Sequence, residues 1–126
     1  MTEKTVLIPG PDHPITVEHS PSRVVVKFGG AVIADTKEAL VLHQAGSPSR
    51  FLFPRKDIKM ELIERNEKTS YCPYKGDASY FNIKNGDTSS IKAAFCYEEP
   101  YAAVAEIKEH LGFYTEKVDS IVEEKV

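Results

Sequence analysis

Short runs of β-branched and aromatic residues, separated by turn-forming residues, recur along most of this sequence. The clearest pair is Arg23–Phe28 and Ala31–Ala34, which Gly29-Gly30 joins. Two-residue hairpin turns need positive φ angles, and glycine adopts these at little cost. The pattern therefore predicts a tight β-hairpin here and a mainly β (α+β) fold overall.

Further strands are predicted where apolar and polar residues alternate or where apolar residues are dense. These are residues 15–19, 39–43, 51–53, 58–63, 78–84 and 91–97. The last two flank Asn85-Gly86, which predicts a second hairpin. The polar segment Glu64–Ser70 has the composition of a loop. We therefore expect a β-rich body over residues 15–97, preceded by an irregular arm over residues 1–14 that is rich in proline.

One helix is predicted near the C-terminus, over residues 100–112. Pro100 suits a first helical turn, where its missing N–H costs nothing. Val104, Ile107 and Leu111 recur at helical spacing, and Gly112 stands where a glycine would end the helix. The remaining tail, residues 113–126, fits either a short helix or a strand end.

The size and composition of the chain restrict its class. Its 126 residues suit a single domain over 1–126, and its formal net charge is −3. No apolar stretch approaches the roughly 18 residues of a membrane span, and the first residues do not resemble a secretory signal. Two cysteines are too few for a disulfide framework. These features predict a soluble, cytoplasmic protein without a membrane partner.

The charges are unevenly distributed along the chain. Residues 50–75 carry seven basic and four acidic side chains inside an otherwise acidic protein. A segment of this kind can attract a small anion, whereas nucleic-acid binding usually comes with a strongly basic domain. We therefore predict a small anionic partner and no nucleic acid.

The densest chemical cluster is Cys72-Pro-Tyr-Lys75-Gly76. Pro73 favours an extended Cys72 and Gly76 permits a chain reversal, so the cluster is displayed at a strand end. Lys75 is near enough in sequence to favour the thiolate of Cys72, which makes both residues candidate catalytic groups. The alternative is that Cys72 is a small buried apolar residue and Lys75 points to water.

Other candidate ligand-binding residues lie on both sides of this cluster. Arg55 follows a proline-fixed bend, where its guanidinium could contact a carboxylate or phosphate, although an exposed arginine paired with Asp57 or Glu61 is the structural alternative. Tyr74, Tyr80 and Tyr97 could line a pocket or belong to the core. The histidines are isolated and there is no Cys-x-x-Cys pair, so no metal is predicted. The glycine-rich phosphate-binding motifs are absent, and no cofactor is predicted.

The order of these segments resembles an uncharacterised bacterial and fungal family, domain of unknown function 427, whose label suggests a nucleotidyltransferase. The resemblance rests on residues 25–35, 53–58, 72–80, 94–100, 107–114 and 118–119. It implies a tent-like fold of coiled antiparallel β-sheets with one C-terminal helix, shared with methionine-R-sulfoxide reductases and zinc-binding chaperone-like proteins. Their zinc-binding Cys-x-x-Cys pairs are absent here, so fold alone transfers neither the metal nor the reductase chemistry.

The resemblance also implies a functional surface. Its motif includes Arg55, Asp57, Cys72, Tyr74, Lys75, Gly76 and Tyr80. The chain has Phe95 where the family often has tryptophan.

Three functions follow from these residues. The first is binding of a small anion, such as a carboxylate or a nucleotide phosphate, in a pocket between the sheets. Arg55, Asp57, Tyr74, Lys75, Tyr80 and Tyr97 are its candidate ligand-binding residues. The second is an enzyme that uses Cys72 with Lys75 or transfers a nucleotidyl group. The third is an interaction module that forms a homodimer through an exposed sheet edge.

Overall fold

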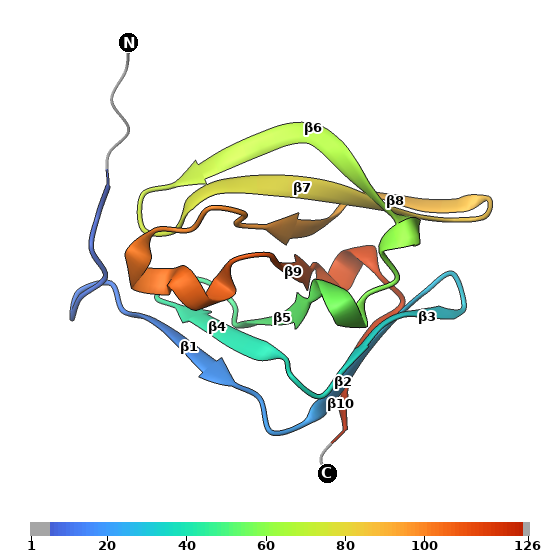
Figure 1. Cartoon of the computed structure of the whole chain (residues 1–126), viewed down its shortest axis with the longest axis horizontal. Coiled ribbons are helices and arrows are strands. Elements are labelled where there is room, and N and C mark those ends of the chain that lie inside the picture. The colour runs from blue at the N-terminus through green and yellow to red at the C-terminus, as the bar shows by residue number, and fades with distance from the viewer. Residues whose placement is uncertain (1–5, 125–126) are drawn as a thin grey trace.

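The structure is a computed structural model and describes residues 6–124. Two antiparallel β-sheets form the body of the protein (Figure 1). The large sheet has the order β1 (Ile15–His19), β4 (Leu40–Gln44), β5 (Arg50–Pro54), β9 (His110–Phe113), β8 (Thr88–Cys96), β7 (Gly76–Asn85) and β6 (Ile63–Cys72). The small sheet has the order β10 (Ser120–Glu124), β2 (Arg23–Phe28) and β3 (Ala31–Thr36). The predicted mainly β fold is confirmed.

Both predicted hairpins are present. Gly29 and Gly30 have φ angles of 60° and 80° in the β2–β3 turn, as a primed turn requires. Asn85 pairs with Thr88 across the β7–β8 turn, where Gly86 has a φ of 63°. These turns form where they are predicted because their geometry depends on the local residues.

The large sheet buries side chains on both faces. Phe81 and Ile83 of β7 belong to a core shared with Val24 and Ile33 of the small sheet. Alternate residues of the same strands point the other way, because successive side chains of a strand face opposite sides. Ala78, Leu42, Leu52, Phe95 and Tyr97 are among those that form this second core. The large sheet curls so that β6 and β7 lie above β1 and β4 in Figure 1.

The predicted helix over residues 100–112 is wrong in type and extent. The structure has a 3-10 helix, η3 (Ala102–Ile107), which is interrupted at Val104, and then strand β9. Val104 and Ile107 are both buried, and their i, i+3 spacing suits a 3-10 turn as well as an α-helix. Gly112 does not end a helix, because it pairs with Leu52 of β5 and Phe95 of β8.

Two neighbouring predictions are also wrong. Residues 58–63 were expected to be a strand, but they contain the 3-10 helix η2 (Met60–Leu62), preceded by η1 (Arg55–Asp57). The polar segment Glu64–Ser70 is not a loop but part of β6, an edge strand with largely exposed side chains. Charged side chains are common on edge strands because they discourage pairing with another chain, so the composition of β6 resembles that of a loop.

The ends of the chain are only partly described. The predicted arm over residues 1–14 is free of strands from residue 6 onward, and its first five residues lie outside the described part. The arm lies against the β6–β7 turn, where the Leu7 N–H donates to the Pro73 carbonyl at 2.9 Å. In the tail, η4 (Thr115–Lys117) precedes β10, which pairs with β2, and residues 125–126 are not described. None of the helical segments in residues 6–124 has the length and apolar character of a membrane span.

Candidate functional site

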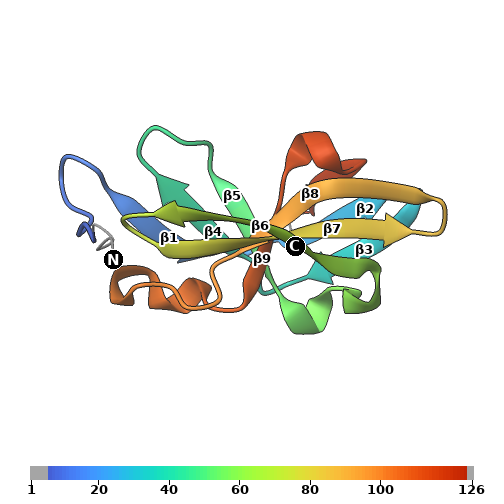
Figure 2. The ribbon, with the colours of Figure 1, turned by 90° about the horizontal axis from the view of Figure 1, so that it is seen from above.

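A cavity of about 180 Å³ opens beside the β4–β5 loop, next to the second core. Figure 2 shows this loop on the opposite side of the molecule from η3. The cavity is lined by Leu42, Gln44, Ser47, Pro48, Arg50, Lys75, Phe95, Tyr97 and Tyr114. Two of these residues are cationic, three are aromatic and none is acidic. All belong to the large sheet or to the segments that adjoin its strands.

Backbone contacts fix the position of Lys75 in the β6–β7 turn. Its N–H donates to the Cys72 carbonyl at 3.2 Å, and its own carbonyl accepts from the Tyr101 N–H at 3.0 Å. Gly76 follows with a φ of 109°, and a Cβ there would lie 3.3 Å from the Glu99 carbonyl oxygen. A glycine therefore lets the β8–η3 segment approach the turn closely, which holds Lys75 beside the cavity.

The Lys75 side chain is half-buried and points over an aromatic ring. Its Nζ lies 4.8 Å from the centroid of Tyr97, within the range of a cation–π contact. Burial lowers the pKa of Lys75, the nearby Cys72 thiol acts in the opposite direction, and the charge of Arg50 lowers the pKa further. The two cations of the cavity therefore lie near enough to repel each other.

Arg50 is the second cation of the cavity, and it is not among the ligand-binding residues predicted from the sequence. Its guanidinium carbon lies 4.9 Å from the centroid of Tyr114. Burial raises the pKa of Tyr114 to about 12, assisted by Tyr80 and opposed by the charge of Arg50. Among residues 6–124, no carboxylate forms an ion pair with Arg50 or Lys75. Apart from their contacts with the Tyr114 and Tyr97 rings, both charges are thus left to the solvent or to a ligand.

Phe95 forms one wall of the cavity and packs against Gly112. A Cβ at Gly112 would lie 2.3 Å from the Phe95 Cζ and 3.0 Å from the Leu52 Cδ2. Real Cβ atoms do not approach other atoms so closely, so the ring position requires a glycine on β9. The absence of a side chain at Gly112 shapes this wall.

Of the predicted residues, Lys75 and Tyr97 line the cavity directly and Cys72 lies beside it. Cys72 is a half-buried free thiol, with its Sγ 4.0 Å from the Gln44 Nε2. Tyr80 packs against the same core, and its hydroxyl is 2.8 Å from the Ser70 Oγ.

Tyr74 points instead to the N-terminal arm. Its ring stacks on His13 with centroids 4.1 Å apart. Because this contact uses the ring face, Tyr74 fastens the arm rather than lining the cavity.

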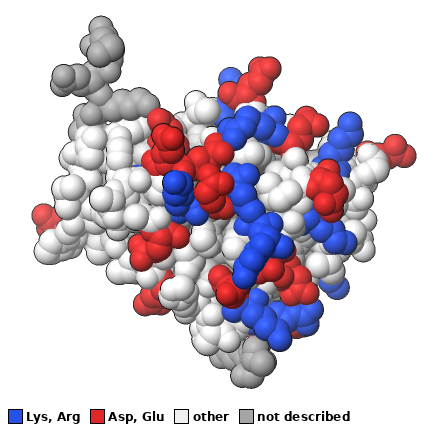
Figure 3. Space-filling view, in the orientation of Figure 1, with Lys and Arg blue, Asp and Glu red and all other residues white. Residues whose placement is uncertain are grey.

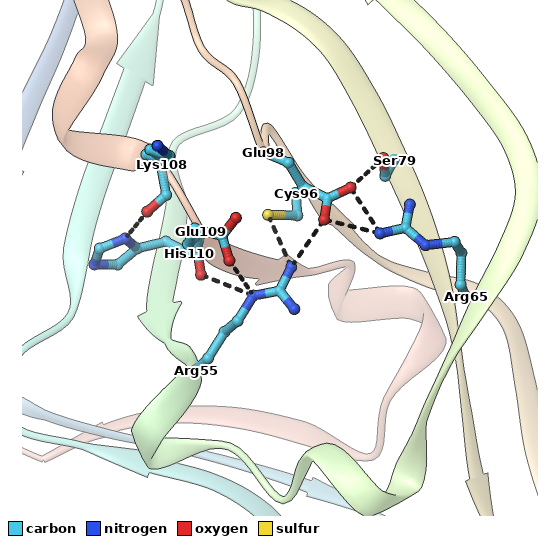
Figure 4. A network of polar contacts seen from close by, with 8 residues as sticks. All are labelled: Arg55, Arg65, Ser79, Cys96, Glu98, Lys108, Glu109 and His110. Carbon is cyan, nitrogen blue, oxygen red and sulfur yellow. Dashed lines mark hydrogen bonds and ion pairs between the residues drawn. The ribbon is translucent and has the colours of Figure 1, made fainter.

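Arg55 lies in a different part of the molecule, in the network of Figure 4. Its guanidinium contacts Glu98 at 3.5 Å, the Glu109 carboxylate at 3.3 Å and the Cys96 sulfur at 3.6 Å. Arg65 donates to both Glu98 oxygens at 2.8 Å, and the Ser79 hydroxyl donates to one of them at 2.8 Å. Acceptors of the protein itself thus occupy Arg55.

The pKa of Glu98 reflects this network. Burial raises it, but hydrogen bonds from Arg65 and Ser79, with the charges of Arg65 and Arg55, lower it by more. A half-buried carboxylate that is held in its ionised form by two guanidinium groups stabilises the fold. We therefore interpret the network as structural.

A second cavity, of about 600 Å³, lies next to this network and is mainly acidic. It is lined by Gly76, Asp77, Ser79, Glu98, Glu99, Tyr101, Lys108 and Glu109. Four carboxylates against one lysine would repel an anion. On the face in Figure 3, basic and acidic side chains are interspersed.

Asp57, another predicted ligand-binding residue, has a structural contact. Its carboxylate accepts a hydrogen bond from the buried Thr36 hydroxyl at 2.7 Å. Thr36 Oγ1 also accepts from the Glu38 N–H at 2.9 Å, so the contact ties η1 to the end of β3. Asp57 lines a cavity with Arg23 and Asp35, and Lys75 is not among the lining residues of that cavity.

The sequence signals for Arg50 and Tyr114 were weak. Arg50 follows the loop residues Ser47-Pro48, and Tyr114 follows the apolar strand β9. An arginine that opens a strand directly after a Gly-Ser-Pro loop was the one local hint, because side chains at strand ends are commonly displayed.

The described residues contain no cluster of three or more His, Cys, Asp or Glu side chains that could hold a metal ion. Comparison with curated proteins finds no match. The sequence profile of one family, NTP_transf_9, matches residues 16–124, which include β2 to β10 and all of β1 except its first residue, Ile15. The chain therefore belongs to the family described as a domain of unknown function, DUF427.

Proposed function

We propose that the protein binds a small anion in the cavity that contains Arg50 and Lys75. The observation that carries the proposal is that two mutually repelling cations line one aromatic cavity, without an acidic lining residue. A bound carboxylate or phosphate would relieve the repulsion and satisfy the guanidinium with two parallel hydrogen bonds.

The size of the cavity limits the ligand. Its 180 Å³ lies below the roughly 300–1,000 Å³ of pockets for drug-sized molecules. A small carboxylic acid or inorganic phosphate fits this volume, whereas a nucleotide would place only part of itself inside. Phe95, Tyr97 and Tyr114 would contact the apolar part of an organic acid.

A thermal-shift screen with small carboxylates, phosphate and nucleotides tests the proposal, with sodium chloride at equal ionic strength as the reference. An anion at about 100 times its Kd should raise the unfolding free energy by about 2.7 kcal/mol, which is a shift of several degrees in Tm. Arg50→Gln and Lys75→Gln should abolish the shift, and Lys84→Gln, at an exposed lysine, should preserve it. A shift that persists in both cavity variants, or no shift with any anion, contradicts the proposal.

Covalent catalysis by Cys72 is a second candidate function. It is favoured by the position of this half-buried thiol, beside Gln44 of the cavity and within electrostatic reach of Lys75. A bound anion would place its reactive atoms near the sulfur.

Homodimer formation stays a prediction. The edge strand β6 bulges between Arg65 and Thr69, a feature that discourages edge pairing.

A further inference from the structure

We propose that Lys75 forms an imine with a small oxo acid whose carboxylate is bound by Arg50. This inference rests on the proposed anion site and adds a reaction to it. It names the substrate class, a short acid with a ketone or aldehyde carbon next to its carboxylate, and it makes Lys75 a covalent nucleophile.

The position of Lys75 suits a nucleophilic amine. The backbone on both sides of the side chain is held by hydrogen bonds, and Nζ lies over the Tyr97 ring at the cavity wall. Among residues 6–124, no carboxylate pairs with this nitrogen to hold it as an ammonium ion. Lys56, in contrast, forms an ion pair with Glu38, and Lys84 is exposed.

The protonation state points in the same direction. Burial lowers the pKa of Lys75, and the charge of Arg50 adds to this effect. Each unit by which a lysine pKa falls increases the neutral fraction near pH 7 by about tenfold. Only the neutral amine attacks a carbonyl carbon, so Lys75 should react faster than an exposed lysine.

The reaction balances without an oxidant or reductant. The lone pair of the Lys75 nitrogen attacks the carbonyl carbon, a C–N bond forms, and the carbonyl oxygen becomes a hydroxyl group. This oxygen then leaves as water, with protons from the nitrogen and the solvent, and a C=N bond remains. Burial raises the pKa values of Tyr97 and Tyr114, so both hydroxyls stay protonated and can donate hydrogen bonds to the departing oxygen.

Arg50 would bind the other end of the substrate. Its guanidinium lines the same small cavity, so a carboxylate on Arg50 lies within a few bonds of the carbon that Lys75 attacks. The positive charge of the protonated imine then has the bound carboxylate as its counter-ion.

Reductive trapping tests the inference. The full-length protein is incubated near pH 7 with glyoxylate or pyruvate and sodium cyanoborohydride, and peptide mass spectrometry locates the reduced adducts. We expect Lys75 to be labelled faster than the exposed Lys84. Arg50→Gln should remove most of this preference, and acetaldehyde, which lacks the carboxylate, should show little of it.

Lys75→Arg retains the charge but cannot form the imine, so the selective adduct should disappear. Labelling of Lys75 no faster than that of exposed lysines would overturn the inference. Thermal stabilisation by propionate, which has no reactive carbonyl, separates the two proposals. If propionate stabilises the protein through Arg50 but no adduct forms, the imine is wrong and the anion site stands; if neither occurs, both fail.

Discussion

Gly112→Ala should destabilise the protein by forcing Phe95 out of its position. The new Cβ would lie 2.3 Å and 2.5 Å from two Phe95 ring carbons and 3.0 Å from Leu52. The strand cannot move away, because Gly112 pairs with β5 on one side and β8 on the other. Its φ lies outside the left-handed region, so the cost is steric. Overpacking of this kind costs about 1–3 kcal/mol, and we expect the free energy of unfolding to fall by this amount.

Urea unfolding of the wild type and the variant measures this difference. Gly10→Ala is the matched control, because an added Cβ there meets no atom within 4 Å and its φ is also not positive; it should change stability by less than about 0.5 kcal/mol. Adding Phe95→Leu to Gly112→Ala should cost less than the sum of the two single changes, since each substitution accommodates the other. A Gly112→Ala variant as stable as the wild type, or strictly additive changes, would refute the packing argument.

Three further predictions concern charge and accessibility. Folding lowers the pKa of Glu98. The ionised Glu98 therefore stabilises the fold above about pH 4.3, and this contribution is lost as the pH falls through the pKa of Glu98 in the folded protein. Between about pH 5 and pH 3 the free energy of unfolding should fall more for the wild type than for Glu98→Gln. Because burial disfavours the charged form of Lys75, Lys75→Met should be more stable than the wild type at pH 7, and this difference in stability should vanish toward about pH 10.4. The control Lys84→Met, at an exposed lysine, should not show this pH-dependent difference. Iodoacetamide should modify the half-buried Cys72 before the fully buried Cys96, and a bound anion should slow this reaction; equal rates with and without anion would place Cys72 outside the site.

The local parts of the fold could be predicted because their signals are local. Gly29-Gly30 and Asn85-Gly86 define hairpins by backbone geometry alone. The segment around Leu111 could not be predicted in this way. Its apolar spacing fits a helix, but it is held as a strand by pairing with β5 and β8, which are distant in the sequence. Tertiary contacts here override a local pattern.

The candidate site could be predicted only in part for a similar reason. Lys75 stands out because Pro73 and Gly76 flank it in a turn, whereas nothing local favours Arg50 over Arg55. Arg50 is the first residue of β5 and Arg55 follows the end of that strand, which spans roughly 16 Å at the usual rise per residue. Arg55 therefore reaches the acidic network and Arg50 the aromatic cavity.

The most direct test of the account is a titration of the ¹⁵N-labelled protein with a small carboxylate or phosphate, followed by amide NMR shifts. We predict saturable shifts at Arg50, Lys75, Tyr97 and Tyr114, with no change around Arg55, and their loss in Arg50→Gln. Shifts centred on Arg55 and Glu98, or no saturable shift at all, would contradict the assignment of the anion site.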